Sequence, residues 1–129
     1  MKLVNLFESP GENAKKVAMT LTTVAPGRWQ TFTEEGTKRP GFKAESKTGT
    51  RAIEVYEDSN GDVLIYLTGS TPAGPDSFKS VIWRQMVKNG WAEHQKNWEE
   101  KWQPHKWKYN KKEEQVFVDF YRIDADKIT

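Results

Sequence analysis

The strongest constraint on the fold is an Asn-Gly turn between two strand-like runs. AIEVYED occupies residues 52–58, VLIYLTG occupies residues 63–69, and SNGD separates them. Asn and Gly both tolerate the positive φ angles that tight hairpin turns need, and Asp58 and Asp62 beside the turn are expected for turn geometry. The second run is apolar on both faces, which is typical of a central strand. The sequence therefore predicts an antiparallel sheet in which the second arm of this hairpin is a central strand.

Two further strands and a long loop are predicted before the hairpin. Over residues 17–24, Val, Met and Leu alternate with Ala and Thr, and this period of two predicts a half-buried strand. Residues 28–33 predict a second strand, with Trp29 and Phe32 on opposite faces. Residues 34–50 contain three Gly, one Pro and many charges, so we expect a long loop there.

After the hairpin, apolar residues recur at helical spacing. Asp76 or Ser77 can cap a helix whose apolar stripe comprises Phe78, Ile82, Trp83, Met86 and Val87, and Asn89-Gly90 is a typical stop. A second helix is expected from Trp91 to about Gln103, where Pro104 ends it. QVFVDFYRI, residues 115–123, is rich in β-branched and aromatic side chains and predicts a closing strand.

This order of elements predicts an α+β fold, in which an antiparallel sheet of about five strands has one or two helices packed on one face. With 129 residues, the chain has the size of one domain, so residues 1–129 are expected to share one core. The turn-rich SPGEN sets residues 1–13 apart as a flexible or separately packed segment.

Composition limits the functional classes. The absence of cysteine excludes disulfides, thiolate nucleophiles and cysteine-bound zinc. No apolar run reaches the roughly 18 residues that cross a bilayer, and the first residues lack the apolar region of a secretory signal. We therefore expect a cytoplasmic protein without membrane association.

Four of the six tryptophans fall within residues 91–109, WAEHQKNWEEKWQPHKWKY. On a helix Trp91, Trp98 and Trp102 share one stripe, so we expect them in the core, with an exposed stacking surface as the alternative. The segment is also basic: residues 83–112 carry a net charge of +5, between a neutral body and a tail of net −3.

Beyond Pro104, aromatic side chains alternate with lysines. This composition suits single-stranded nucleic acid, because rings stack on bases while ammonium groups approach phosphates. It also suits an edge strand whose lysines discourage aggregation, and we expect this structural edge or a loop first. The candidate residues for binding a ligand or partner are Lys106, Trp107, Lys108, Tyr109, Lys111 and Lys112.

The other polar residues give weaker predictions. His94 and His105 lack the spacing and the further ligands of a metal site, so we expect surface histidines, no metal, no cofactor and no catalytic residue. Asp119 interrupts an apolar strand: it can pair with Arg122 or a lysine, bind a ligand, or face water, and we expect water. The basic residues of the 34–50 loop are expected to be solvated, with closure over a ligand as the alternative; they are Lys38, Arg39, Lys43 and Lys47.

The opening residues MKLVNLFE resemble the short N-termini of small tailed-phage proteins. Leu6-Phe7-Glu8 is similar to the L-x-E pattern after which the prohead proteases of T-even-like phages cut. In that family such peptides direct internal proteins into the capsid before cleavage. The resemblance implies a viral accessory protein acting in the host cytoplasm.

These observations together predict a non-enzymatic binding protein, encoded by a phage, that binds or inhibits a host protein or a small anionic ligand. The alternative is a protein that binds single-stranded nucleic acid or a nucleotide through residues 105–112. A third hypothesis is an enzyme that uses Asp119 with a histidine. The sequence leaves the oligomeric state and the partner's identity open.

Overall fold

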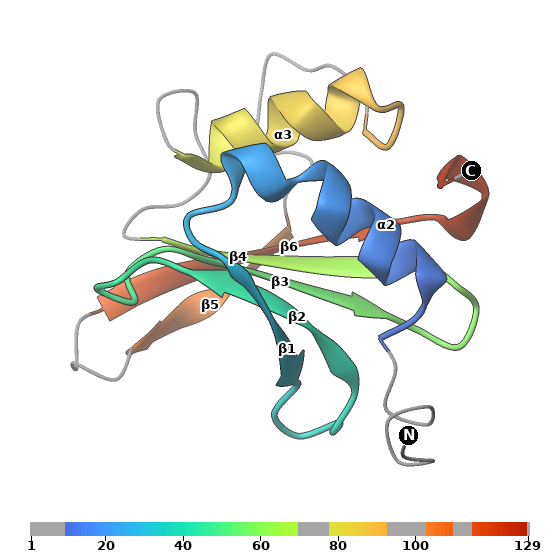
Figure 1. The fold of residues 1–129 in the computed structure, drawn as a ribbon. Coiled ribbons are helices and arrows are strands. Elements are labelled where there is room, and N and C mark those ends of the chain that lie inside the picture. Colours follow the sequence, from blue (N-terminus) through green and yellow to red (C-terminus); the bar gives the residue numbers. More distant parts are fainter. Residues whose placement is uncertain (1–9, 70–77, 93–102, 110–114, 129) are drawn as a thin grey trace.

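A computed structural model describes residues 10–69, 78–92 and 115–128, together with the backbone of residues 103–109. In this part of the chain six strands form one antiparallel sheet in the order β1-β2-β3-β4-β6-β5. The strands are β1 Trp29–Thr33, β2 Pro40–Glu45, β3 Ala52–Glu57, β4 Val63–Gly69, β5 Gln103–Tyr109 and β6 Gln115–Ile123. Two helices, α2 Glu12–Thr20 and α3 Phe78–Lys88, lie on one face of the sheet (Figure 1). The predicted α+β class is confirmed, with one strand more than expected.

The predicted hairpin and the central strand are both confirmed. β4 pairs with β3 on one side and with β6 on the other. Its alternate residues Val63, Ile65 and Leu67 are fully buried among the core residues beneath the helices. In the turn, the Asp58 N–H donates to the Asp62 carbonyl at 2.9 Å. Gly61 has φ 85° and Asn60 keeps a negative φ, so this turn uses one left-handed residue and not two.

α3 matches the predicted apolar stripe and the predicted stop. Ile82, Trp83 and Met86 are fully buried against the sheet. After Lys88 the chain closes the helix through Gly90, which has φ 78°, and the Trp91 N–H donates to the Met86 carbonyl at 2.9 Å. None of the helices in the described residues is both long and apolar enough to cross a bilayer.

The predicted second helix lies mostly outside the described residues, which resume after Ala92 at Gln103. Trp91 is only 4% exposed and belongs to the core, which confirms the inward orientation expected for this tryptophan. Trp98, Trp102 and His94 lie outside the described residues, as do the proposed capping residues Asp76 and Ser77.

The strand predicted over residues 17–24 is wrong. Helix α2 runs to Thr20, and a short 3-10 turn follows at Thr22–Val24. The buried side chains recur at helical spacing, namely Ala14, Val17, Ala18 and Leu21. Met19, which an alternating strand would bury, is 66% exposed. The threonines fit the helix because the Thr20 hydroxyl donates to the Lys16 carbonyl at 2.8 Å.

The loop predicted over residues 34–50 contains β2. Phe42 packs against the core and Ala44 is buried within it, because β3 and β1 hold β2 between them. The charged residues Lys43 and Glu45 alternate with these and lie on the face of the sheet away from the helices, hereafter the helix-free face. Charge at alternate positions is therefore compatible with a strand at this place in the sheet.

Asp119 does not face water, contrary to the prediction. Its register opposite Leu67 places it on the face that the helices cover. There its Oδ2 lies 2.6 Å from the Lys79 Nζ, and Asp119 is 2% exposed while Lys79 is fully buried. The pairing with a lysine, which was one of the alternatives for Asp119, is the one that forms.

Candidate functional site

A cleft of about 540 Å³ opens on the helix-free face where β1 and β2 meet the turn that precedes β1. The turn contributes its backbone at residues 26–27, and two strands and their flanking loops contribute side chains. These side chains are Arg28, Gln30, Phe32, Lys43, Glu45 and Lys47. The lining therefore combines three cations, one carboxylate, one amide and one aromatic ring.

Strand register brings the central members of this set together. Gln30 pairs with Lys43, and Phe32 pairs with Gly41, so all of them share the helix-free face. Gly41 adds no side chain to this face, and a Cβ there would come within 2.3 Å of the Tyr56 ring. The Phe32 ring therefore has Lys43 as its diagonal neighbour across the strand pair.

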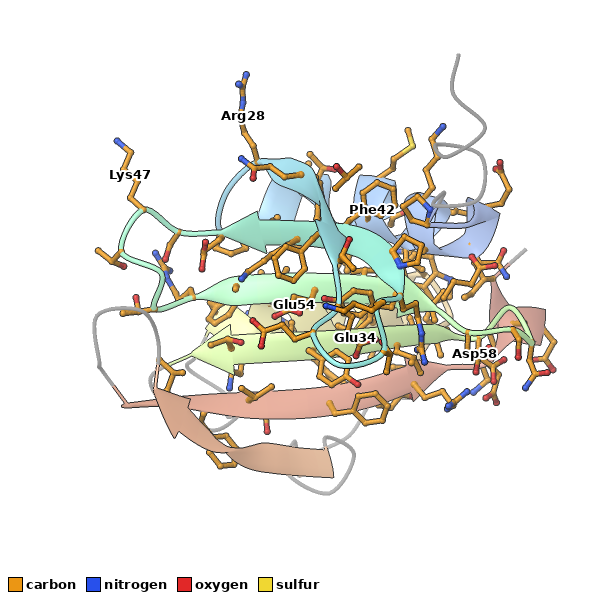
Figure 2. All side chains as sticks on the ribbon, turned by 90° about the horizontal axis from the view of Figure 1, so that it is seen from below. Arg28, Glu34, Phe42, Lys47, Glu54 and Asp58 are labelled. Atoms are coloured by element: carbon orange, nitrogen blue, oxygen red, sulfur yellow. The ribbon has the colours of Figure 1, made fainter. Side chains whose placement is uncertain are left out.

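A close backbone approach places Arg28 beside β2. A Cβ on Gly27 would lie 2.2 Å from the carbonyl oxygen of Glu45, so only glycine lets the turn contact the strand this closely. Lys47 lies two residues after the end of β2. Figure 2 shows Arg28 and Lys47 projecting from the same border of the molecule, at the rim of the cleft.

The positive charge of the cleft is only partly neutralised. The Lys43 ammonium lies 3.6 Å from the Glu45 carboxylate and 4.5 Å from the centre of the Phe32 ring. Arg28 and Lys47 are exposed, and neither forms an ion pair with another described residue. Two cationic groups at the rim are thus available to an anion from outside the chain.

Chemically, this arrangement suits binding of a carboxylate or a phosphate. A guanidinium can hold either group by paired hydrogen bonds, and a lysine adds a mobile point charge. The apolar ring of Phe32 supplies contact area beside the charges. Within the described ranges, no group of three or more His, Asp or Glu side chains is placed to hold a metal ion.

A second polar group lies over the centre of the helix-free face, where the tip of the β1–β2 hairpin covers the sheet. Figure 2 shows Glu34 and Glu54 in this area. The buried Tyr56 hydroxyl donates to Glu54 at 2.5 Å, and burial together with Glu54 raises the pKa of Tyr56. Burial and the nearby Glu34 raise the pKa of Tyr66. Both phenols therefore stay protonated at physiological pH. The Tyr56 hydroxyl bonds within β3, whereas the Tyr66 hydroxyl interacts with Glu34 at the hairpin tip.

The predicted binding residues lie at the opposite border of the sheet. Lys106, Trp107, Lys108 and Tyr109 belong to β5, which among the described strands pairs with β6 alone and is therefore an edge strand of this sheet. The predicted structural edge is confirmed, while a ligand role for these residues stays a prediction. Lys111 and Lys112 lie outside the described residues.

The basic residues of the predicted loop 34–50 lie in three different environments. Lys43 and Lys47 line the cleft, and closure of this segment over a ligand stays a prediction. Arg39 lies 3.7 Å from the Glu34 carboxylate, and Lys38 is exposed at the hairpin tip with φ 61°. Sequence reasoning missed Arg28, Gln30 and Phe32, although the expected orientation of Phe32 opposite Trp29 was correct.

Comparison of the chain with protein-family models, with curated proteins and with solved structures gave no match.

Proposed function

We propose that this chain is a non-enzymatic binding protein whose cleft at the β1–β2 border receives an acidic group of its partner. The observation that carries the proposal is the unbalanced charge of the cleft, where Arg28 and Lys47 stand at the rim without an ion-pair partner among the described residues. A concave site with a net positive charge also raises the rate of encounter with a negatively charged partner.

The partner in this proposal is a host protein or a small anionic ligand. The resemblance of residues 1–8 to phage openings supports a host protein, which a phage accessory factor binds or inhibits. A pull-down from host lysate, with and without nuclease, distinguishes a protein partner from a nucleic-acid partner. A protein that is retained after nuclease treatment, and lost when the cleft charges are removed, supports this proposal.

The cleft is tested directly with fluorescein-labelled poly-glutamate as an acidic probe. The double variant Arg28→Gln/Lys47→Gln is expected to weaken binding about tenfold at low salt, because each exposed ion pair contributes up to about 1 kcal/mol. Fluorescence anisotropy at two salt concentrations measures the change. Both residues are exposed, so the fold is expected to survive the substitutions.

A matched control removes the same charge elsewhere. Lys15 and Lys16 are exposed on α2, on the other face of the molecule, and Lys15→Gln/Lys16→Gln has the same net charge as the cleft variant. At 0.1 M salt, its affinity for poly-glutamate is expected to stay within about twofold of the original chain, because charges farther away than a Debye length of about 10 Å are then screened. Equal weakening in both double variants would reject the cleft as the site.

The alternative function, binding of single-stranded nucleic acid, rests on the edge strand β5. β5 carries Lys106 and Lys108 on either side of Trp107 in an edge strand, which is the arrangement that single-strand binding uses. Its test is a labelled single-stranded oligonucleotide: each neutralised phosphate adds roughly 0.7 to the log–log slope of affinity against salt. Lys106→Gln/Lys108→Gln should then reduce that slope, and no binding at low salt removes the alternative.

A further inference from the structure

The outer edge of β1 presents backbone groups that no described residue engages. The Glu34 N–H donates to the Arg39 carbonyl at 2.8 Å, which makes these two residues a hydrogen-bonded pair. Hydrogen-bonded and non-hydrogen-bonded pairs alternate along an antiparallel ladder, so Gln30 and Phe32 bond to β2. The backbone N–H and C=O groups of Trp29, Thr31 and Thr33 consequently point outward, away from β2.

The two edges of the sheet differ in how they are protected. Natural edge strands usually carry lysines, a proline or a bulge that hinders pairing with another chain. β5 has all three, with Pro104, Lys106 and Lys108 and a register shift between residues 104 and 106. β1, with the sequence WQTFT, has none of them, and Thr31 and Thr33 are exposed. β1 is thus the edge that is open to a further strand.

Positive charge borders this open edge on the helix-free face. Arg28 directly precedes β1, and the Lys43 ammonium lies over the Phe32 ring, so the Lys43 side chain leans from β2 toward β1. A strand added to β1 would run about 4.8 Å beyond it, with every second side chain on the helix-free face. Those side chains would lie beside Gln30 and Phe32, next to the cations of the cleft.

We propose that the partner's acidic group belongs to an extended peptide segment that adds to β1 as a further strand of the sheet. The outward N–H and C=O groups of β1 bind its backbone, and carboxylates at every second position face the cleft. The recognised sequence is therefore an acidic segment with alternating small or β-branched residues. This inference rests on the proposed function, since it names the class of partner for the same cleft.

The peptide arm of the test uses a labelled nine-residue peptide of alternating Thr and Glu. Its matched control is methylated on the backbone nitrogens of its threonines. For a peptide strand antiparallel to β1, this removes the donors that face β1 and leaves every charge in place. We expect the methylated peptide to bind at least about tenfold more weakly in fluorescence anisotropy, because several backbone hydrogen bonds of about 0.5–1.5 kcal/mol each are lost.

The protein arm uses Thr31→Pro, which removes an outward N–H. The ladder to β2 is kept because the Thr31 N–H does not bond to β2, and proline is tolerated in edge strands at such positions. Thr31→Val keeps the N–H and is the matched control. We expect peptide binding to weaken about two- to tenfold with proline and not to change with valine, because one backbone hydrogen bond is lost. Circular dichroism verifies that both variants are folded.

The outcomes separate the inference from the proposed function. If the methylated peptide or Thr31→Pro binds as tightly as its control while Arg28→Gln/Lys47→Gln loses poly-glutamate, strand addition is wrong and the anionic cleft stands. If neither the peptide nor poly-glutamate binds, both are wrong. If Thr31→Pro instead converts a dimer into a monomer in analytical ultracentrifugation, the occupant of the edge is a second copy of this chain, which also overturns the inference.

Discussion

The ammonium of the buried Lys79 contacts Asp119 and Phe117 of β6. It lies 2.6 Å from the Asp119 carboxylate, 3.0 Å from the Phe117 carbonyl and 5.4 Å from the centre of the Phe117 ring. Burial lowers the pKa of Lys79, and the hydrogen bond and charge of Asp119 oppose that shift. Gly69 makes room for the side chain, because a Cβ there would come within 3.0 Å of the lysine Cε. The pair joins α3 to β6 beneath the helices.

Removing one charge of this pair should lower the free energy of unfolding more than removing both charges. Lys79→Met leaves the Asp119 carboxylate buried without its cation, and we expect a loss of about 3–5 kcal/mol in the free energy of unfolding. Lys79→Met/Asp119→Leu removes both charges and should recover most of that loss. Urea unfolding at neutral pH measures both variants. The single variant Asp119→Leu completes the comparison. If the loss in the double variant equals the sum of the losses in Lys79→Met and Asp119→Leu, packing and not charge sets the cost.

The sequence identifies Asp119 as a charged residue within an apolar strand, but it does not identify the partner of Asp119. A carboxylate inside VFVDFY is visible in the sequence, yet the cation that compensates it stands 40 positions earlier, on α3. Period-two alternation leaves open which face of a strand is covered, and the assignment of Asp119 to water chose the wrong face. Lys79 itself has no distinguishing sequence feature, since lysine at the start of a helix is usually solvated.

Among the elements, α2 shows how two periods can compete within one segment. Val17, Met19 and Leu21 satisfy a strand period, while Ala14, Val17 and Leu21 satisfy a helix period. The helix begins earlier than the strand pattern, and the Glu57 carboxylate on β3 accepts the Ala14 N–H at 2.9 Å at its first turn. That contact comes from a distant strand, so the sequence alone could not decide the competition.

The cleft could not be predicted from the sequence for a related reason. Its lysines come from β2 and the residues after it, and residues 34–50 were interpreted as a loop because glycines and charges dominate them. Only the register with β1 and β3 shows that Lys43 and Glu45 point to one face while Phe42 and Ala44 point to the other. By contrast, the β3–β4 hairpin, α3 and β6 have strong local patterns, and their positions were predicted correctly.

The free edge of β1 predicts an alternating pattern of amide hydrogen exchange. The amides of Gln30 and Phe32 bond to β2 and should exchange slowly, whereas the Thr31 and Thr33 amides face outward and should exchange fast. Hydrogen exchange followed by NMR gives these rates residue by residue. Equal protection of Thr31 and Phe32 in the free protein would mean that the outer edge of β1 is already covered.

At the scale of the molecule, helices and sheet share one core. The Trp83 ring of α3 meets the Tyr121 ring of β6 edge-on, with centres 5.1 Å apart and planes at 82°. Residues of α2 join the same cluster of buried side chains, beside those of β3 and β4. The two layers therefore depend on each other for burial.

This shared core predicts a single unfolding transition. Tryptophan fluorescence reports the packing, far-UV circular dichroism reports the backbone, and their midpoints in urea should coincide with an m value of about 1–3 kcal/mol/M. Trp83→Phe should lower both midpoints together, because it leaves a cavity between the layers. Two separate midpoints would contradict the expectation that residues 1–129 form one domain.

The order of the strands also has a consequence for how the chain assembles. β1 to β4 follow one another as neighbours, so their pairing closes only short loops. The pairing of β4 with β6 is different, because Gly69 pairs with Phe117 and the loop to be closed comprises residues 70–116. Closing a longer loop costs more chain entropy and slows folding. During synthesis, the most apolar strand of the sheet therefore leaves the ribosome well before the strand that finally covers its second edge.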